Sequence, residues 1–245
     1  MLARADAVGA TAIYGGTSDN RHRARDHVHR GEKTIDVGGG SSRIDLGLIA
    51  TSEVTLAALH ADEVLEEKLL PLRYAGYSHC FRQEGGSYGK YSRGFYRVHQ
   101  FSKIEMFIYA LPEDSSRLHE ELLRLEEELW QGLGIPYRAL EMCTGDLGAM
   151  AARKFDLEAW MPGRNDWGEV TSASNVTDYQ ARNLNVRYKK DDGNHGFIHM
   201  LNGTAIATSR AFVAILENYQ QEDGSIKIPE VLRPYMGGME YIAKT

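Results

Sequence analysis

Two stretches of strand-forming sequence joined by a glycine-rich segment constrain this chain most. Residues 74–82 and 95–110 predict two strands. The segment between them, residues 85–90, is Gly-Gly-Ser-Tyr-Gly-Lys, which differs from the two-residue loop of a tight hairpin. The pattern therefore predicts two strands joined by a long loop.

The two predicted strands carry residue types that suit a nucleotide together with an amino acid. Arg82 provides a rigid, always-charged fork for phosphate or carboxylate groups, and the ring of Phe101 offers a face on which a purine can stack. A carboxylate beside such a fork, as at Glu84 or Glu105, does not bind phosphate. It suits the exocyclic amine of adenine or a substrate ammonium group. We therefore interpret this region as a nucleotide and amino-acid site.

Composition sets the broad class of the protein. The chain has 245 residues and a formal net charge of -6, which argues against binding nucleic acid through bulk charge. Its two cysteines, Cys80 and Cys143, do not have metal-type spacing. No apolar run approaches the length of a membrane span, and the start of the chain lacks the apolar core of a signal peptide. We expect a cytoplasmic protein in a reducing compartment, without a membrane partner.

The sequence changes character near Asp45. Residues 1–44 contain no proline and little apolar periodicity, and the tract 21–30 is dense in cationic and titratable side chains. Such a segment offers too little apolar surface to offset the entropy lost on ordering. We predict two parts, with residues 1–45 as a poorly ordered N-terminal segment and residues 46–245 as the folded core.

The folded core is expected to combine several strands with few helices. Helices are expected over residues 57–70, 115–131 and 208–220, and further strands over residues 155–161, 184–188 and 196–201. The middle helix is amphipathic, with an apolar stripe made by Leu118, Leu122, Leu125 and Leu129. Successive strands with few intervening helices favour an α+β fold, with an antiparallel sheet flanked by helices.

Four blocks of sequence resemble the catalytic core of the class II aminoacyl-tRNA synthetases, most closely the seryl-tRNA synthetases. They are Thr51-Ser52-Glu53, residues 81–105, Glu169 to Ser174 and Leu201 to Arg210, and the tail 228–238 resembles that family's C-terminal end. Each block is short, but four in the family's order are specific. The resemblance covers residues 46–245. It implies a serine–tRNA ligase, which activates L-serine with ATP to seryl-adenylate and transfers the seryl group to tRNA(Ser).

The resemblance implies an ATP site in which Arg82 and Arg210 are the catalytic residues. Arg82 would bridge the serine carboxylate and the α-phosphate, and Arg210, at a helix N-terminus, would hold the γ-phosphate with help from Arg97. Glu169 and Ser172 would bind a Mg²⁺ ion that bridges phosphates. The residues implied to bind ATP are Arg82, Gln83, Glu84, Val98, Phe101, Glu169, Val170, Thr171, Ser172 and Arg210.

The resemblance also implies a serine site made by Thr51, Ser52, Glu53, Arg82, Glu105 and Thr204. Thr51 and Glu53 would receive the ammonium group, and Glu105 and Thr204 would read the hydroxyl. A buried carboxylate positioned to accept a hydrogen bond from the substrate hydroxyl lowers kcat/KM for alanine, which lacks that hydroxyl, by roughly 10⁴–10⁵-fold. The zinc-dependent branch of the family carries cysteine ligands where this chain has Thr51 and Asn202, so no zinc is expected.

Two features of the family have no counterpart in the sequence. They are the long helical arm that grips tRNA and the first class II motif, which builds the homodimer interface. We therefore expect a synthetase-like core truncated at its N-terminus, in which tRNA binding and dimerisation rest on resemblance alone. Two alternatives remain open. One is a truncated, non-catalytic paralogue that binds ATP or seryl-adenylate, and the other is an aminoacyl:carrier-protein ligase, although those enzymes resemble the zinc type.

Overall fold

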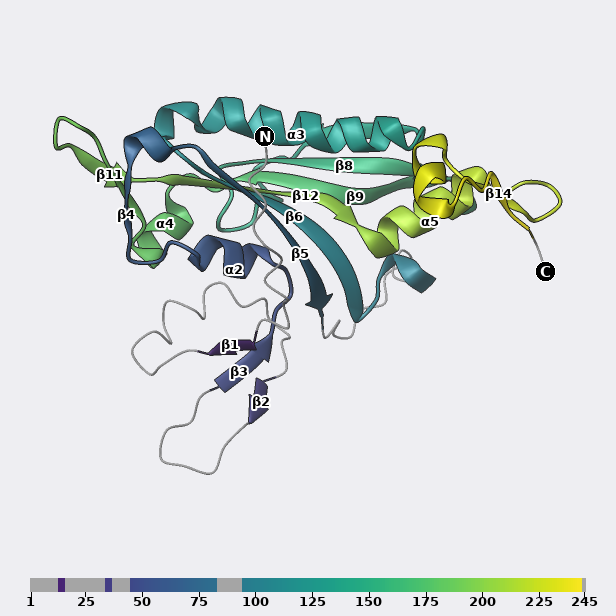
Figure 1. The fold of residues 1–245 in the computed structure, drawn as a ribbon, viewed down its shortest axis with the longest axis horizontal. Coiled ribbons are helices and arrows are strands. Elements are labelled where there is room, and N and C mark those ends of the chain that lie inside the picture. The colour runs from purple at the N-terminus through teal and green to yellow at the C-terminus, as the bar shows by residue number, and fades with distance from the viewer. Residues whose placement is uncertain (1–12, 16–33, 37–44, 83–93, 244–245) are drawn as a thin grey trace.

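The fold is built on an antiparallel sheet that has six strands in the part of the chain that the structure describes (Figure 1). The computed structural model describes residues 13–15, 34–36, 45–82 and 94–243. Across the sheet the strands follow the order β5 (Leu72–Phe81), β6 (Gln100–Ala110), β12 (His199–Ala207), β9 (Asp166–Asn175), β8 (Arg153–Met161) and β7 (Tyr137–Glu141). Every neighbouring pair is antiparallel, which confirms the predicted α+β class.

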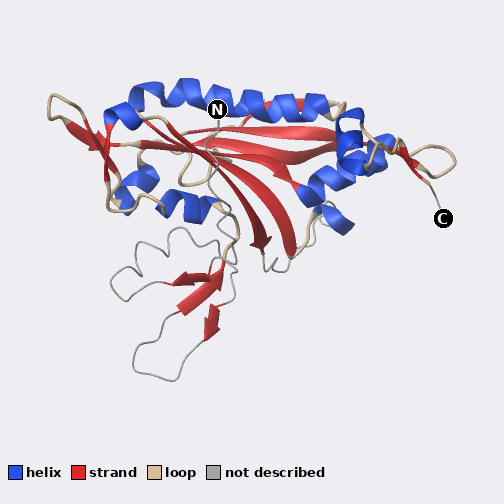
Figure 2. Cartoon of the chain, viewed as in Figure 1, coloured by secondary structure: helices blue, strands red, loops and turns tan. Residues whose placement is uncertain are grey.

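Helices cover both faces of this sheet (Figure 2). The longest, α3, runs along one face, where α5 shares an apolar cluster with the end of α3, and α2 and α4 lie against the other face. Their bounds are α2 (Glu53–Ala58), α3 (Ser115–Gly132), α4 (Tyr179–Leu184) and α5 (Thr208–Tyr219). The predicted helices over 115–131 and 208–220 are therefore confirmed.

Alternation along β6 decides which side chains meet which helix, because successive residues of a strand point to opposite faces. Met106, Ile108 and Ala110 share an apolar cluster with side chains of α3. Phe107 and Tyr109 belong to a different cluster, with residues of α2 and α4. One strand thus joins two separate cores.

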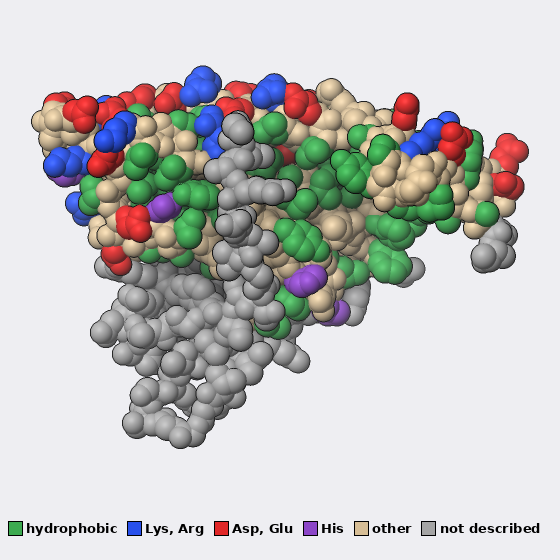
Figure 3. Space-filling view, viewed as in Figure 1, with side chains coloured by type: hydrophobic (Ala, Val, Ile, Leu, Met, Phe, Trp, Pro, Cys, Tyr) green, Lys and Arg blue, Asp and Glu red, His purple; other side chains and the backbone are tan. Residues whose placement is uncertain are grey.

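The buried face of α3 includes three polar residues. Its buried side chains are Ser115, Leu118, His119, Leu122, Glu126 and Trp130. Leu118 and Leu122 lie on the predicted stripe, but Leu129 is 42% exposed, so its expected core position is wrong. A stripe predicted from the apolar residues alone is misplaced, because the polar residues His119 and Glu126 occupy buried positions. The outer side of α3 is charged, and it lines the upper edge of the molecule in Figure 3.

Leu122→Ala should lower the free energy of unfolding by about 2–5 kcal/mol, because the removed side chain is 1% exposed and leaves a cavity. Leu129→Ala on the same helix is the matched control. It should cost less than about 1 kcal/mol, because that side chain is already 42% exposed. Urea unfolding of both variants measures the difference, and equal losses would contradict this orientation of α3.

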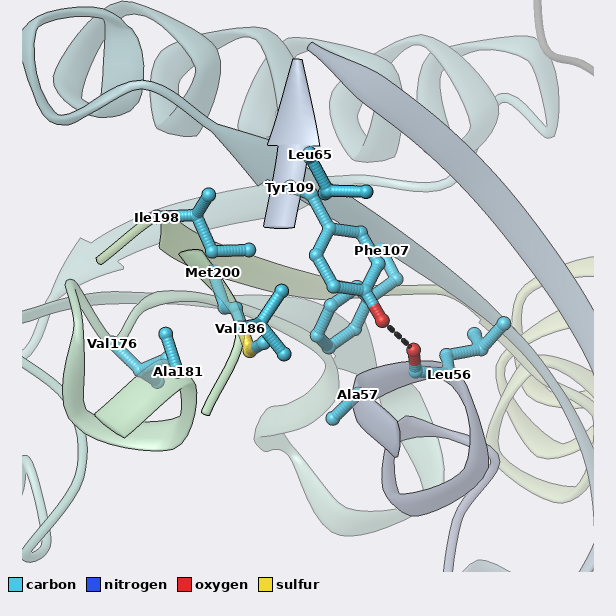
Figure 4. Close-up of a cluster of buried hydrophobic side chains, with 10 residues drawn as sticks. All are labelled: Leu56, Ala57, Leu65, Phe107, Tyr109, Val176, Ala181, Val186, Ile198 and Met200. Atoms are coloured by element: carbon cyan, nitrogen blue, oxygen red, sulfur yellow. Dashed lines mark hydrogen bonds between the residues drawn. The ribbon is translucent and has the colours of Figure 1, made fainter. Parts of the chain in front are cut away.

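A second apolar cluster holds α2 and α4 against the sheet (Figure 4). Phe107 and Tyr109 of β6 pack there with Leu56 and Ala57 of α2. The Tyr109 hydroxyl also donates a hydrogen bond to the backbone carbonyl of Leu56. Burial raises the pKa of the Tyr109 phenol, which therefore stays protonated as a donor. These contacts fix α2, and with it the segment just before that helix.

The segment after α2 differs from the sequence prediction. The helix expected over residues 57–70 is wrong, because α2 ends at Ala58 and the chain continues through β4 (Val64–Glu66) and a 3₁₀ helix (Glu67–Leu69). Likewise, the strand expected over residues 184–188 is replaced by the end of α4 and by β10 (Arg187–Lys189). β4 pairs in parallel with β10, which pairs in turn with β11 (His195–Phe197). This long-range pairing overrides the local helix pattern.

Smaller elements complete the described chain. They are β1 (Ile13–Gly15), β2 (Thr34–Asp36), β3 (Asp45–Leu48), β13 (Ile226–Lys227), β14 (Tyr241–Ile242) and 3₁₀ helices at Gly94–Tyr96, Pro112–Asp114, Pro162–Arg164 and Glu230–Met236. The predicted poor order of residues 1–45 falls mostly on residues outside the described ranges. Among the residues described, no helix is both long and apolar enough to cross a membrane.

Candidate functional site

A cavity of about 500 Å³ lies on the face of the sheet opposite α3. Phe101, Lys103 and Glu105 of β6 line it, at the alternate positions that continue to Phe107 and Tyr109. Its volume is in the range of small-molecule sites. The alternation of β6 therefore places two sets of side chains on one face of the sheet. One set packs against α2, and the other, which includes Lys103 and Glu105, forms the polar floor of the cavity.

One end of the cavity is formed by two acidic residues with a lysine between them. Glu105 is 2% exposed, and its Oε2 atom forms an ion pair with Lys103. The same Oε2 atom accepts a hydrogen bond of 3.4 Å from the Thr51 hydroxyl. Thr204 lies opposite Glu105 in the register of β12 with β6, so its side chain lines the same end.

Glu53 is the second acid at this end. Its Oε1 atom accepts hydrogen bonds from Gln180 Nε2 at 2.7 Å and from Asn202 Nδ2 at 3.2 Å. Burial raises the pKa of the Glu53 carboxyl, and the nearby charge of Glu105 raises it further, whereas Lys103 opposes both effects. The two carboxylates and one ammonium give this end a formal charge of -1, which suits a ligand that carries an ammonium group.

The opposite end of the cavity begins where β5 ends. The backbone N–H of Arg82 donates to the His99 carbonyl at 2.9 Å, which fixes the residue beside the start of β6. The Arg82 guanidinium lies over the Phe101 ring, with Cζ at 5.1 Å from the ring centroid. Arg97 and Val98 line the cavity near this pair. Phe101 and Glu105 are four residue steps apart on β6, so the two ends lie about 13 Å apart.

Arg210 reaches the same end from the first turn of α5. Its Nη1 atom lies 3.0 Å from Glu169 Oε1 and donates to the Glu169 backbone carbonyl at 3.0 Å. The Tyr96 hydroxyl donates to that carbonyl as well, at 2.7 Å. The Tyr96 ring contacts two guanidiniums, those of Arg210 at 5.0 Å and Arg164 at 4.9 Å from its centroid. Arg210 is therefore held by β9 and by an aromatic ring.

Oxygen donors that suit a hard cation lie near Arg210. Glu169 and Ser172 of β9 line the cavity, and Asp156 of β8 lies opposite Ser172 in the strand register. Burial raises the pKa of the Asp156 carboxyl, and the charge of Glu169 raises it further, while Lys154 lowers it. Of these residues, Glu169 and Ser172 line the cavity, and a carboxylate with a hydroxyl is the kind of oxygen donor that suits Mg²⁺.

The structure brings most of the residues expected from the sequence to this one cavity. The expected residues that line it are Thr51, Glu53, Arg82, Val98, Phe101, Glu105, Glu169, Val170, Thr171, Ser172, Thr204 and Arg210. Ser52 does not line it, because its hydroxyl donates to the Gly76 carbonyl at 3.4 Å. Gln83 and Glu84 lie outside the described residues.

Sequence reasoning missed several side chains that line the cavity. Among them are Lys103, Tyr96 and Lys154. Lys103 could have been found, because it alternates with Phe101 and Glu105 at a spacing of two. No local signal identifies Tyr96 or Lys154, since contacts of a 3₁₀ helix with Glu169 and Arg210 bring Tyr96 to the site and pairing of β8 with β9 brings Lys154 there.

A further buried acid lies on the other face of the sheet. Glu126 of α3 is completely buried, and its Oε2 atom accepts a hydrogen bond of 2.8 Å from the Thr171 hydroxyl. Its Oε1 atom has no hydrogen-bond partner among the described residues, and a Cβ atom on Gly203 would lie 2.9 Å from it. Burial raises the pKa of this carboxyl well above its usual value.

Glu126→Gln should change how stability depends on pH. A carboxyl whose pKa is raised by folding adds stability at low pH, and that stability is lost as pH rises through the native-state pKa. The difference in unfolding free energy, variant minus wild type, should therefore grow with pH, by up to about 1.4 kcal/mol per pH unit above the unfolded-state pKa. Urea unfolding at a series of pH values tests this, and a difference that does not change with pH would refute it.

Comparison with protein families identifies the class of this core. The family model described as the tRNA synthetase class II core domain (G, H, P, S and T) matches residues 41–219. That match covers well over half of the chain and includes both ends of the cavity.

Curated relatives agree with this match. The chain is 66% identical to a serine–tRNA ligase of Dictyoglomus thermophilum over 193 residues, which is 79% of the chain and 45% of the relative. It is 50% identical to a serine–tRNA ligase of Rhodopirellula baltica over 231 residues, 93% of the chain and 52% of the relative. The chain thus spans about half the length of these relatives.

Solved structures share the fold. A seryl-tRNA synthetase from Pyrococcus horikoshii complexed with ATP matches with a TM-score of 0.80 and 52% identity, over 86% of this chain and 47% of that one. A cytoplasmic serine–tRNA ligase from Naegleria fowleri in complex with AMP matches with a TM-score of 0.80 and 42% identity, over 94% and 53%. A Giardia lamblia prolyl-tRNA synthetase, at 14% identity and a TM-score of 0.78 over 95% and 46%, shares the fold alone.

Proposed function

Because the chain belongs to the class II tRNA synthetase core family, we propose that it activates L-serine with ATP and transfers the seryl group to tRNA(Ser). One observation carries the proposal. A single cavity has the Phe101–Arg82 pair at one end and the acids Glu53 and Glu105 at the other. Similarity to serine–tRNA ligases, one of them complexed with ATP, supports these substrates.

The proposed first step is an in-line displacement at the α-phosphate. A carboxylate oxygen of serine attacks the α-phosphorus, the bond to the oxygen that bridges to the β-phosphate breaks, and pyrophosphate leaves. This step needs positioning and charge neutralisation rather than a protein nucleophile. Arg82 would lie between the serine carboxylate and the α-phosphate, Arg210 would hold the γ-phosphate, and Phe101 would stack on adenine.

Glu169 and Ser172 would hold Mg²⁺ beside the phosphates. The ion supplies positive charge to the phosphate oxygens when it is bound. Arg210 contacts both the side chain and the backbone carbonyl of Glu169. Glu169 would therefore bind the cation and also position the arginine that would hold the γ-phosphate.

The acidic end would select serine. Glu53 and Thr51 would receive the ammonium group, and Glu105 with Thr204 would accept the side-chain hydroxyl. Alanine lacks that hydroxyl and would leave a buried carboxylate oxygen without a donor, which is costly. Threonine would be excluded by crowding of its extra methyl group.

Transfer to tRNA forms the second half of the proposal. A terminal ribose hydroxyl of tRNA(Ser) attacks the carbonyl carbon of seryl-adenylate and AMP leaves. This step and a cytoplasmic setting enter by similarity to the relatives, of which the chain spans about half.

The chain should catalyse exchange of labelled pyrophosphate into ATP only when serine is present. Alanine or threonine should support exchange at least 10²-fold less well than serine, for the reasons given above. A thermal shift with a non-hydrolysable seryl-adenylate analogue accompanies the assay. Binding without exchange would assign a non-catalytic role, and neither binding nor exchange would overturn the proposal.

Arg210→Ala should lower kcat/KM for exchange by about 10²–10³-fold, because a preorganised positive group at the phosphates is lost. Arg124→Ala is the matched control. Arg124 lies on α3, on the other face of the sheet, with its side chain 59% exposed. It should retain the wild-type rate. An Arg210→Ala chain with unchanged kinetics would remove this residue from the proposed ATP site.

A further inference from the structure

Lys103 is a buried cation at the acidic end of the cavity. Its side chain is 9% exposed, and it forms an ion pair with Glu105, whose side chain is 2% exposed. Lysine is almost never buried to this extent unless it has a charged partner. An ordinary surface ion pair would leave both groups solvated, so burial here calls for another explanation.

The contacts to the two acids leave one oxygen of each carboxylate open. On Glu105, both Lys103 and the Thr51 hydroxyl use Oε2. On Glu53, both amide donors, Gln180 and Asn202, use Oε1. Glu105 Oε1 and Glu53 Oε2 therefore accept no hydrogen bond from the described residues, although both side chains line the cavity. Each carboxylate is therefore held in place through one oxygen, and its other oxygen can accept a hydrogen bond from a ligand.

The charge of Lys103 acts on both acids. Two carboxylates at one buried site repel, and without a cation one of them takes up a proton. A protonated carboxyl carries its own O–H and no longer serves purely as an acceptor. Lys103 counters this, so both open oxygens stay available. The formal charge of -1 at this end then matches a ligand with a single ammonium group.

We propose that Lys103 is a positioning residue that sets amino-acid specificity. It holds Glu105 Oε2 and offsets the charge of the two acids, so that Glu105 Oε1 faces a ligand hydroxyl while Glu53 Oε2 faces the ligand ammonium. This inference rests on the proposed function. It assigns to a lysine, acting through its carboxylate partner, a role in the recognition of a small hydroxyl-bearing amino acid.

Lys103→Met tests the inference in the pyrophosphate exchange assay. KM for serine should rise about 10–100-fold, because truncating one partner of a buried charge pair leaves the other unpaired. KM for ATP should stay within about twofold, and the preference for serine over alanine should fall by at least about tenfold. A purely structural role would instead weaken both substrates together. Lys68→Met, at a side chain 74% exposed and outside the cavity, is the matched control and should match wild type.

A thermal shift with ATP shows whether the Lys103→Met chain is folded. If it does not bind ATP, the same measurements are made on Lys103→Gln, which keeps a donor to Glu105 but removes the charge. It should show the same serine-specific defect. An unchanged KM for serine in the folded variant, or equal losses for serine and ATP, would overturn the inference. A wild-type chain that neither exchanges pyrophosphate nor binds the seryl-adenylate analogue would overturn the proposed function, and this inference with it.

Discussion

The register between β6 and β12 is the constraint on which the whole site depends. Thr204 lies opposite Glu105, and Ala207 lies opposite Lys103, so the acidic end and the start of α5 have a fixed separation. Side chains alternate with a period of two, and a slip of one residue would turn the polar floor of the cavity toward α3. Burial of Met106 and its neighbours against α3 opposes that slip. Apolar packing on one face therefore holds the polar geometry of the other face.

The buried acids on the two faces of the sheet are chemically alike, but they differ in whether the side chain reaches a cavity. Glu126 has one bonded oxygen, and its other oxygen faces the backbone at Gly203. Glu53 and Glu105 also have one bonded oxygen each, but their other oxygens belong to side chains that line a cavity. An open acceptor beside a cavity can receive a ligand donor, whereas one beside the backbone only costs stability. This difference separates the proposed recognition groups from a buried residue that the proposed chemistry does not use.

The sequence predicts the residues of the site better than it predicts the path of the chain. Phe101 and Glu105 share an alternating strand with Lys103, so local periodicity alone places them on one face. The prediction of a helix over residues 57–70 was wrong because β4 pairs with a strand more than a hundred residues later in the chain. The local sequence pattern carries no signal for such pairing. The prediction that Leu129 is buried was wrong because polar side chains occupy part of the buried face of α3. A search for apolar residues alone cannot detect them.

In the proposed reaction, two anions must meet, namely the amino-acid carboxylate and the triphosphate. Two unit charges 4 Å apart repel by about 4 kcal/mol at an effective dielectric constant of 20, so the site has to supply opposing charge. Arg82 and Arg210 supply it at one end of the cavity. The acidic end, about 13 Å away along β6, repels phosphate and attracts ammonium. Separation of charge between the two ends of the cavity would therefore orient both proposed substrates, because each has only one end of the cavity in which its charge is stabilised.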